Sequence, residues 1–194
     1  KKILLVNLSK GKLGDINSSL LGLIITGKLL IAALSRVDLP QENRQDFYLY
    51  MDEFQNFTTE SIATILAEAR KYRLCLTIAH QYISQLEEKI KNAVFGNVGS
   101  MACFRVGVED AAFMAKQYEP VFSETDLINI ENFNAYVKLL INGLPSVPFN
   151  IATYPAGPID PATAAAVKEM SRSKYGREKN LVEQEILERT KIQI

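Results

Sequence analysis

Two adjacent carboxylates, Asp52 and Glu53, follow directly after the apolar run Phe47–Met51. The run shows no alternation of apolar and polar residues, which is typical of a strand buried on both faces of a parallel sheet. Ligands bind at the carboxyl ends of such strands in open α/β sheets. There the Asp could hold a magnesium shell and the Glu could polarise an attacking water. The alternative is a strand that ends in two solvated acids at a turn.

Polar residues farther along the chain extend this pair into a candidate site for nucleotide hydrolysis. Gln81 follows the next predicted strand, Leu74–Ala79, and from a neighbouring strand tip its amide could touch both a phosphate and the attacking water. Arg70 ends the preceding predicted helix and could stabilise phosphate charge in a neighbouring subunit. The alternatives are a polar loop residue for Gln81 and a cation favoured by the helix dipole for Arg70. We expect His80 to be a neighbour of this site and not its catalytic base.

A glycine–lysine spacing in the first predicted helix resembles a phosphate-binding loop but is not expected to be one. The segment Gly22-Leu-Ile-Ile-Thr-Gly27-Lys28-Leu29 fits G-x-x-x-x-G-K but lacks the final Ser/Thr and the preceding strand. Its centre is apolar and helical in pattern, whereas a phosphate cradle needs an open loop of backbone N–H groups. We expect a buried helix in which two small residues allow a close packing contact.

The elements that must position these residues alternate between strand and helix. This order predicts an α/β fold with a mostly parallel sheet flanked by helices, a C-terminal hairpin and a helical tail. The predicted boundary divides residues 1–154 from a linker and tail at 155–194. The predicted strands are Ile3–Leu8, Phe47–Met51, Leu74–Ala79 and Ser100–Val108, the helices are Ser19–Arg36, Thr58–Tyr72 (with an apolar stripe at Ile62, Ile65, Leu66 and Ala69) and Leu86–Phe95, and a further helix follows Glu109-Asp110. The hairpin pairs Ala135–Ile141 with Phe149–Tyr154 around Asn142-Gly143, and the tail helices are Pro161–Met170 and Asn180–Arg189.

Composition limits the classes of function. Lys+Arg and Asp+Glu both total 22, so DNA contact requires local loops or an assembly, because the chain has no global basic field. Cys75 and Cys103 lie in apolar runs and are predicted to be core residues in a reducing compartment. The single histidine excludes a His-rich metal cluster. No apolar stretch is expected to reach the roughly 18 residues of a transmembrane helix, and no signal peptide is expected at Lys1–Val6.

Three segments together resemble the ATPases of conjugation and type IV secretion, which belong to the FtsK–HerA superfamily of DNA-pumping motors. They are Tyr48–Phe57, Leu66–Leu74 and Ala79–Leu86; Leu4–Gly14, Phe104–Ala112 and Ser171–Arg177 extend the resemblance over about residues 1 to 190. The resemblance implies a RecA-like P-loop NTPase core that assembles into ring hexamers. Such rings hydrolyse ATP with Mg²⁺ and move DNA, or energise the export of protein and DNA, at the cytoplasmic face of the inner membrane.

The motif match also implies roles for individual residues. Asp52 corresponds to the Walker B magnesium residue, Glu53 to the catalytic glutamate, Gln81 to the sensor and Arg70 to an arginine finger that acts in a neighbouring subunit. Arg73 and Arg105 are further candidates for contacts between subunits. The alternative for Arg105 is an ordinary charge at a strand edge.

One departure from the family pattern is large. In the family a Walker A loop precedes the strand that resembles Ile3–Leu8, and here nothing precedes it. The chain is therefore expected to be the carboxyl-terminal part of a motor domain that binds ATP weakly and hydrolyses none by itself. The alternative function is a non-catalytic module, derived from an ATPase and kept for binding partners or for ring assembly. The choice between coupling protein, secretion ATPase and helicase, and between DNA and protein cargo, stays open.

Overall fold

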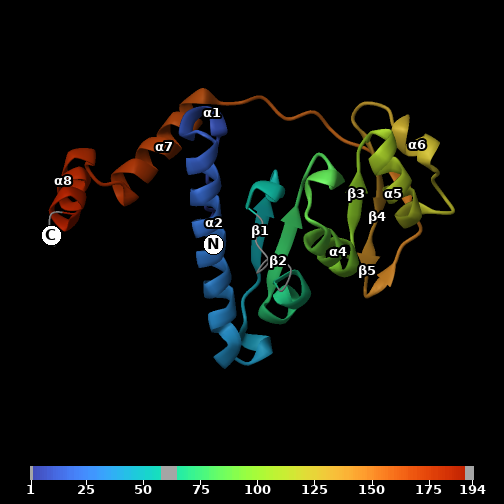
Figure 1. Ribbon diagram of the computed structural model, residues 1–194, viewed down its shortest axis with the longest axis horizontal. Helices are drawn as coiled ribbons and strands as arrows, with labels where there is room; N and C mark the ends of the chain where they lie inside the picture. Colours follow the sequence, from blue (N-terminus) through green and yellow to red (C-terminus); the bar gives the residue numbers. More distant parts are fainter. Residues whose placement is uncertain (1, 58–64, 191–194) are drawn as a thin grey trace. The chain divides into compact units, whose positions relative to one another are not determined.

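The computed structural model describes residues 2–57 and 65–190. The chain divides into two compact units, Lys1–Thr153 and Tyr154–Ile194, whose elements are shown in Figure 1. Among the described residues, the strands lie in the first unit, and the regular elements of the second unit are helices. Each unit is described in turn.

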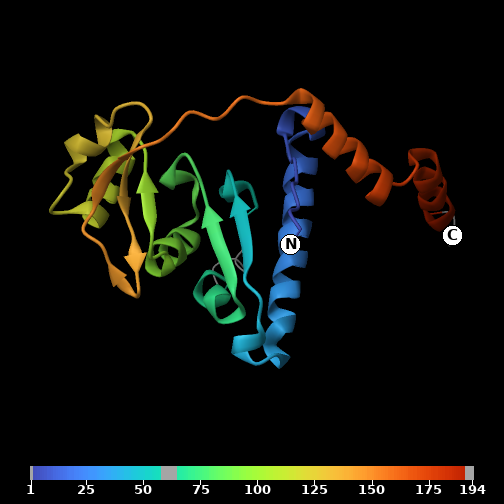
Figure 2. The same cartoon turned by 180° about the vertical axis from the view of Figure 1, so that it is seen from behind.

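The longest element is helix α2 (Asp15–Leu34), which follows the short helix α1 (Lys10–Leu13). In both ribbon views it runs alongside strand β1 (Figures 1 and 2). Two 3₁₀ turns, η1 (Ser35–Asp38) and η2 (Gln41–Asn43), then lead to that strand. The predicted first helix is thus confirmed and begins four residues earlier than expected, at Asp15.

Helix α2 corrects one expectation from the sequence. The segment Asp15–Asp38 is long and apolar enough to cross a membrane by length and composition alone, with 24 residues and a mean hydropathy of 1.9. The expectation that no segment would reach this threshold was wrong because it required an unbroken apolar run. The mean hydropathy of the segment is high despite the interruptions at Gly22, Thr26 and Lys28.

No strand forms at Ile3–Leu8, so this prediction was wrong. Residues 2–9 adopt no regular element, and the side chains of Ile3, Leu4 and Leu5 are 88%, 69% and 81% exposed. A strand requires a hydrogen-bonded neighbour. None of the strands in the described part of the chain pairs with this run.

Strands β1 (Phe47–Met51) and β2 (Leu74–Ile78) form a parallel pair in the register Phe47↔Leu74 to Met51↔Ile78. One face of the pair packs against apolar side chains, among them Ala33 of α2. The other face is open, with Tyr48 and Tyr50 62% and 72% exposed. Burial on both faces was therefore a wrong expectation: the alternate positions of β1 carry tyrosines, which are apolar in body and polar at the tip.

The helix predicted at Thr58–Tyr72 lies partly outside the described residues, which exclude Thr58, Thr59, Glu60 and Ile62. Residues 65–68 are helical and continue into the 3₁₀ turn η4 (Ala69–Tyr72). The turn ends at Arg73, whose φ of 57° is left-handed. This reversal starts β2 directly after the turn.

The second half of this unit holds an antiparallel sheet with the strand order β3-β4-β7. Its strands are β3 (Met101–Cys103), β4 (Asn134–Lys138) and β7 (Phe149–Ala152). The helices of this half are α4 (Glu88–Asn97), α5 (Val108–Tyr118) and α6 (Glu124–Ile128). Earlier in the chain, the 3₁₀ turn η3 (Phe54–Phe57) follows β1 and the 3₁₀ turn η5 (Ile83–Gln85) follows β2. The mixed α/β class holds. A mostly parallel sheet is not confirmed, because β1 and β2 form the one parallel pair among the described strands.

The predicted hairpin consists of two nested antiparallel pairs. The outer pair is β4 with β7, and the inner pair is β5 (Leu140–Ile141) with β6 (Leu144–Pro145). The inner turn is Asn142-Gly143, with φ of 51° and 81°, and two left-handed residues are what a tight type I′ hairpin turn requires. The long gap between the outer strands is thereby explained.

The second unit contains helices α7 (Pro161–Tyr175) and α8 (Lys179–Thr190), and neither has a buried residue. Helix α7 begins where the sequence predicts, because Asp160 caps it by accepting a hydrogen bond from the Ala162 N–H at 3.0 Å. Proline at the first helical position, Pro161, reinforces this start.

Candidate functional site

The carboxyl ends of β1 and β2 form the edge at which the candidate site lies. Pairing continues just past both strands: the Ala79 N–H donates to the Met51 carbonyl at 2.9 Å, and the Phe54 N–H donates to the Ala79 carbonyl at 3.1 Å. The turn that follows β1 and the loop that follows β2 are therefore held together. The structure thus brings Glu53 next to Gln81.

The Glu53 carboxylate accepts hydrogen bonds on both oxygens. Its Oε1 accepts from the Gln81 side-chain amide, and its Oε2 accepts from the Gln55 amide at 2.6 Å. The same Gln55 nitrogen donates to Oε1 of Gln85 at 3.0 Å. Sequence reasoning found Glu53 and Gln81 but missed Gln55 and Gln85.

The backbone at Glu53 has an uncommon conformation, with a φ of 50°. A left-handed non-glycine residue is sparsely populated and persists only where its surroundings fix it. Here the Glu53 carbonyl accepts from the Asn56 N–H at 3.0 Å and from the Asn56 side-chain amide at 3.1 Å. Asn56 is in turn held by Lys10, whose ammonium donates to the amide oxygen at 3.0 Å.

Asp52 is exposed and accepts a hydrogen bond from the Glu53 N–H at 3.0 Å. Among residues 2–57 and 65–190, no group of three or more His, Cys, Asp or Glu side chains could hold a metal ion. A site made entirely of protein ligands is thus absent from that part of the chain. Magnesium, however, commonly keeps several waters and binds through one or two carboxylates plus substrate phosphates, and an exposed Asp52 fits that donor set.

His80 packs against Phe54 near the Glu53 carboxylate. Its centroid is 5.7 Å from that of Phe54, edge to face. Burial lowers the pKa of His80 below its ordinary 6.5, although a backbone hydrogen bond at Tyr82 and the charges of Asp110 and Glu53 act in the opposite direction. Its buried Nδ1 has no hydrogen-bond partner among the described residues.

The loop after β2 is tied to helix α5 by Asp110. This carboxylate is 9% exposed and accepts a hydrogen bond from the Ile83 N–H at 3.2 Å. The Ile83 side chain lies in a core cluster with Ala111 and Tyr118 of α5. The loop that carries Gln81 and Gln85 is therefore anchored to the core through Ile83.

Arg70 and Arg73 lie at the opposite end of the strands. The five residues of β2 separate this end from Gln81, which is about 16 Å at the usual rise per residue. Arg73 pairs with Asp46 at 3.3 Å, while Arg70 is exposed and forms no side-chain hydrogen bond or ion pair with any described residue. The structure does not bring either arginine to Glu53 within one chain.

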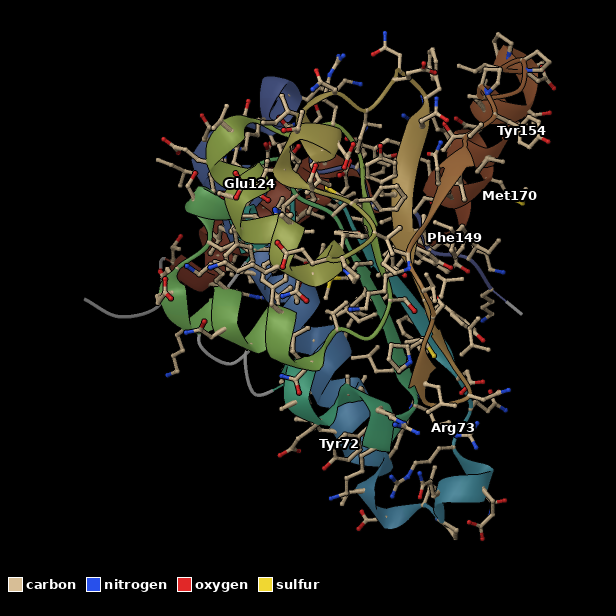
Figure 3. All side chains as sticks on the ribbon, turned by 90° about the vertical axis from the view of Figure 1, so that its right-hand side faces the viewer. Tyr72, Arg73, Glu124, Phe149, Tyr154 and Met170 are labelled. Carbon is tan, nitrogen blue, oxygen red and sulfur yellow. The ribbon has the colours of Figure 1, made fainter. Side chains whose placement is uncertain are left out.

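The turn that carries Arg70 is fixed by two arginines that sequence reasoning missed. Arg44 donates to the Lys71 carbonyl at 2.6 Å, and Arg36 donates to the Tyr72 carbonyl at 3.0 Å. The Arg44 guanidinium also lies 5.6 Å from the centroid of the Tyr72 ring. Tyr72 and Arg73 are neighbours at this end of the molecule (Figure 3).

Arg105 lies in the exposed loop between β3 and α5. Its side chain forms no hydrogen bond or ion pair within residues 2–57 and 65–190, and no contact links it to Glu53. The hollow between α2 and the strands is lined by apolar side chains such as Leu30, Leu49 and Leu76. The charged groups of the candidate site therefore lie at an open edge and not in that hollow.

The cysteines divide between surface and core. Cys103 is buried, as predicted, and Cys75 is exposed on the open face of β2. The prediction that Cys75 is a core residue was wrong for the same reason as the prediction for β1, because the face that carries Tyr48 and Tyr50 also carries Cys75. Burial raises the pKa of the Cys103 thiol to about 11.

Part of the chain that carries this geometry matches a family of conjugation proteins. Residues 46–117 match the family TraG-D_C, described as the TraM recognition site of TraD and TraG. No curated protein matches the chain. The matched range contains every candidate site residue, from Asp52 to Arg105.

Solved structures of a conjugative coupling protein share the fold. The bacterial conjugative coupling protein TrwBdeltaN70, in its unbound form, matches with a TM-score of 0.57 and 18% identity over 71% of this chain and 38% of that one. The plasmid coupling protein TrwB in complex with ADP and Mg²⁺ matches with a TM-score of 0.56 and 18% identity over 69% of this chain and 37% of that one. The chain thus spans less than two fifths of the length of these structures. Residues 46–117 match the TraG-D_C family, and the resemblance to conjugation proteins that the sequence predicts is confirmed for this segment, while the solved structures confirm the fold.

Proposed function

We propose that this chain carries the Walker B half of an ATP-hydrolysing site in a motor that moves DNA, or protein, during conjugation or type IV secretion. The observation that carries the proposal is the Glu53 carboxylate at the carboxyl edge of a parallel strand pair, with the Gln81 amide bonded to it. The family match over residues 46–117 and the ADP and Mg²⁺ bound by TrwB support it.

In this proposal each residue has a distinct task. Asp52 holds the Mg²⁺ ion of bound ATP through water, and that ion would neutralise charge on the phosphates. Glu53 orients a water and accepts its proton. Gln81, bonded to Glu53, reports the state of the phosphates to the loop after β2.

Arg70 acts on a neighbouring copy in this proposal. It is exposed, unpaired among the described residues, and at the opposite end of β2 from Gln81. An arginine that stabilises phosphate charge at the site of the next subunit must lie away from its own site. This placement supports a ring, for which a hexamer is the proposed form, with Arg73 and Arg105 as further intersubunit candidates.

A non-catalytic module is the second candidate, and one observation favours it. The 194 residues contain no G-x-x-x-x-G-K-[ST] sequence, so the isolated chain is expected to bind ATP weakly and hydrolyse none. In this version the matched region serves assembly with components of the conjugation machinery, a TraM-like protein among them. We place either form in the cytoplasm, at the inner membrane.

ATP hydrolysis measured in two contexts separates the candidates. The longer polypeptide in which this chain supplies the Walker B half is expected to hydrolyse ATP with Mg²⁺ and to respond to DNA, whereas the isolated chain shows no steady turnover. The matched pair is Glu53→Gln and Glu42→Gln, the latter exposed in turn η2. Loss of turnover with the first alone supports the motor; wild-type turnover with both contradicts it. Turnover by the isolated chain that Glu53→Gln abolishes would contradict the expected inactivity.

A further inference from the structure

We propose that Gln55 and Gln85 are positioning residues that fix the Glu53 carboxylate for its reaction with water. The inference rests on the proposed function, because it assigns a role to groups that act through Glu53. Neither glutamine belongs to the pattern Asp52, Glu53, Gln81 and Arg70 that the sequence predicts.

The contacts form a chain of side chains that crosses from one strand end to the other. Gln81 bonds one oxygen of Glu53, Gln55 bonds the other at 2.6 Å, and Gln85 accepts from Gln55 at 3.0 Å. Gln55 lies in turn η3 after β1, and Gln85 in turn η5 after β2. The loop after β2 thus contacts one carboxylate oxygen of Glu53 directly, through Gln81, and is linked to the other through Gln55.

This arrangement fixes the Glu53 carboxylate and still leaves it able to accept further hydrogen bonds. An ionised carboxylate offers about four lone-pair sites, and the two amides occupy two of them. The remaining sites can accept a hydrogen bond from water. Because each oxygen has its own donor, rotation of the carboxylate about its terminal bond would break both hydrogen bonds, which is how a group is held in a productive orientation.

The turns that carry the two glutamines are themselves fixed by the core. Phe54, next to Gln55, is fully buried and packs in one cluster with Leu86, next to Gln85. The carboxylate of Asp110 holds the start of turn η5 through the Ile83 N–H. Gln55 and Gln85 are therefore mounted on turns whose positions do not depend on the glutamines, so their replacement is expected to disturb Glu53 more than the fold.

Gln55 donates the hydrogen bond to Gln85, and this direction allows substitutions that keep or remove the bond. Their effects on kcat distinguish a positioning role from a structural one. Gln85 is the acceptor, so Gln85→Glu keeps the bond, and Gln85→Leu removes it. Gln55 is the donor, so Gln55→Glu removes the bond and places a second carboxylate against Glu53, where like charges repel. Gln41→Glu, at an exposed position in η2, is the matched control for the added charge.

The experiment measures kcat and KM for ATP hydrolysis by the longer motor polypeptide with these variants. We expect Gln55→Glu and Gln55→Leu to lower kcat by up to about a hundredfold with little change in KM, because the glutamines act on the reacting group and not on nucleotide binding. Gln85→Leu should lower kcat less, and Gln41→Glu should behave like the wild type. Gln85→Glu keeps the acceptor but brings a carboxylate within about 6 Å of Glu53, so it should lower kcat slightly and by less than Gln85→Leu does. Equal losses in Gln85→Glu and Gln85→Leu would overturn the inference.

A second readout tests the geometry without hydrolysis. In the 194-residue chain, Glu53→Gln should shift the side-chain amide signals of Gln55 and Gln81 in a nitrogen–proton NMR spectrum, while those of Gln41 stay in place. Unshifted Gln55 signals would overturn the inference. If Gln55 variants retain full kcat while Glu53→Gln abolishes turnover, the positioning role fails and the proposed function stands; if Glu53→Gln retains turnover, both fail.

Discussion

His80 is a residue whose protonation the structure constrains from several sides. It is the one histidine in the chain, and burial lowers its pKa while the carboxylates of Asp110 and Glu53 oppose the change. As the pH falls below 6.5, the ordinary pKa of histidine, the unfolded chain takes up a proton before the folded chain does. The free energy of unfolding therefore falls as the pH drops through this range and levels off below the folded pKa.

A titration of the His80 ring proton by NMR checks this expectation. The signal of a single histidine is unambiguous, and its midpoint should lie below 6.5 in the folded chain and return close to it in urea. Asp110→Asn removes a charge that raises the pKa, so the midpoint should move lower still. A midpoint at or above the ordinary value in the folded chain would contradict the burial seen at this ring.

The two thiols are expected to differ in reactivity. Cys103 is buried and its pKa is raised to about 11, so almost none of it is thiolate at pH 8. Cys75 is exposed, although desolvation and the nearby Asp46 charge raise its pKa as well. A thiol-reactive dye should label one cysteine in the folded chain and both after unfolding.

The variant Cys75→Ser provides the control for this labelling. It should leave a folded chain with no rapidly labelled thiol, because the attacking species is the thiolate and Cys103 is shielded. Rapid labelling of the folded variant would show that the face around Cys103 opens to solvent.

At the residue scale, the sequence predicts a contact between two side chains when the backbone topology alone brings them together. Glu53 and Gln81 meet because parallel strands deliver their carboxyl ends to one edge. Gln55 and Gln85 were missed because their partners depend on the left-handed conformation of Glu53 and on the course of two 3₁₀ turns. No spacing rule for strands or helices encodes that geometry.

The two glycines of α2 give a test at the element scale. A Cβ on Gly22 would lie 2.1 Å from the Phe57 ring, whereas a Cβ on Gly27 would meet nothing within 4 Å. Gly22→Ala should therefore destabilise the chain by about 1–3 kcal/mol through overpacking. Gly27→Ala should stabilise it by about 0.5–1 kcal/mol, because alanine loses less entropy in a helix.

Thermal or urea unfolding of both variants beside the wild type measures these changes. Opposite signs are expected from one chemical change in one helix, so each variant serves as the control for the other. A stabilising Gly22→Ala would show that Phe57 moves aside without cost. The result also bears on the packing contact expected from the sequence, which the structure places at Gly22 and not at Gly27.

Elements with a clear pattern were predicted well, but one strand pairing was missed. The long helix α2, the parallel pair β1–β2 and the hairpin at Asn142-Gly143 follow from runs, caps and turn residues. The pairing of β3 with β4 was missed because thirty residues of helix and loop separate the strands. Ile3–Leu8 has a strand composition but no partner, and composition alone does not supply one.

At the scale of the whole molecule, the predicted site residues lie at two opposite ends of the β1–β2 strand pair. Asp52, Glu53 and Gln81 follow the strands, while Arg70 precedes β2. With a net charge of zero, no global field draws nucleic acid to the chain. Both features fit the proposed assembly, in which the arginine end of one copy would meet the carboxylate edge of the next.

In the proposed site, the Glu53 carboxylate is the group that accepts a proton from the attacking water. The direct measurement is ATP turnover by the longer motor polypeptide with Glu53→Gln, together with the binding of nucleotide to the same variant. The predicted result is a loss of turnover of at least about a hundredfold, with nucleotide binding retained and Glu42→Gln unaffected. Wild-type turnover by Glu53→Gln would contradict the account.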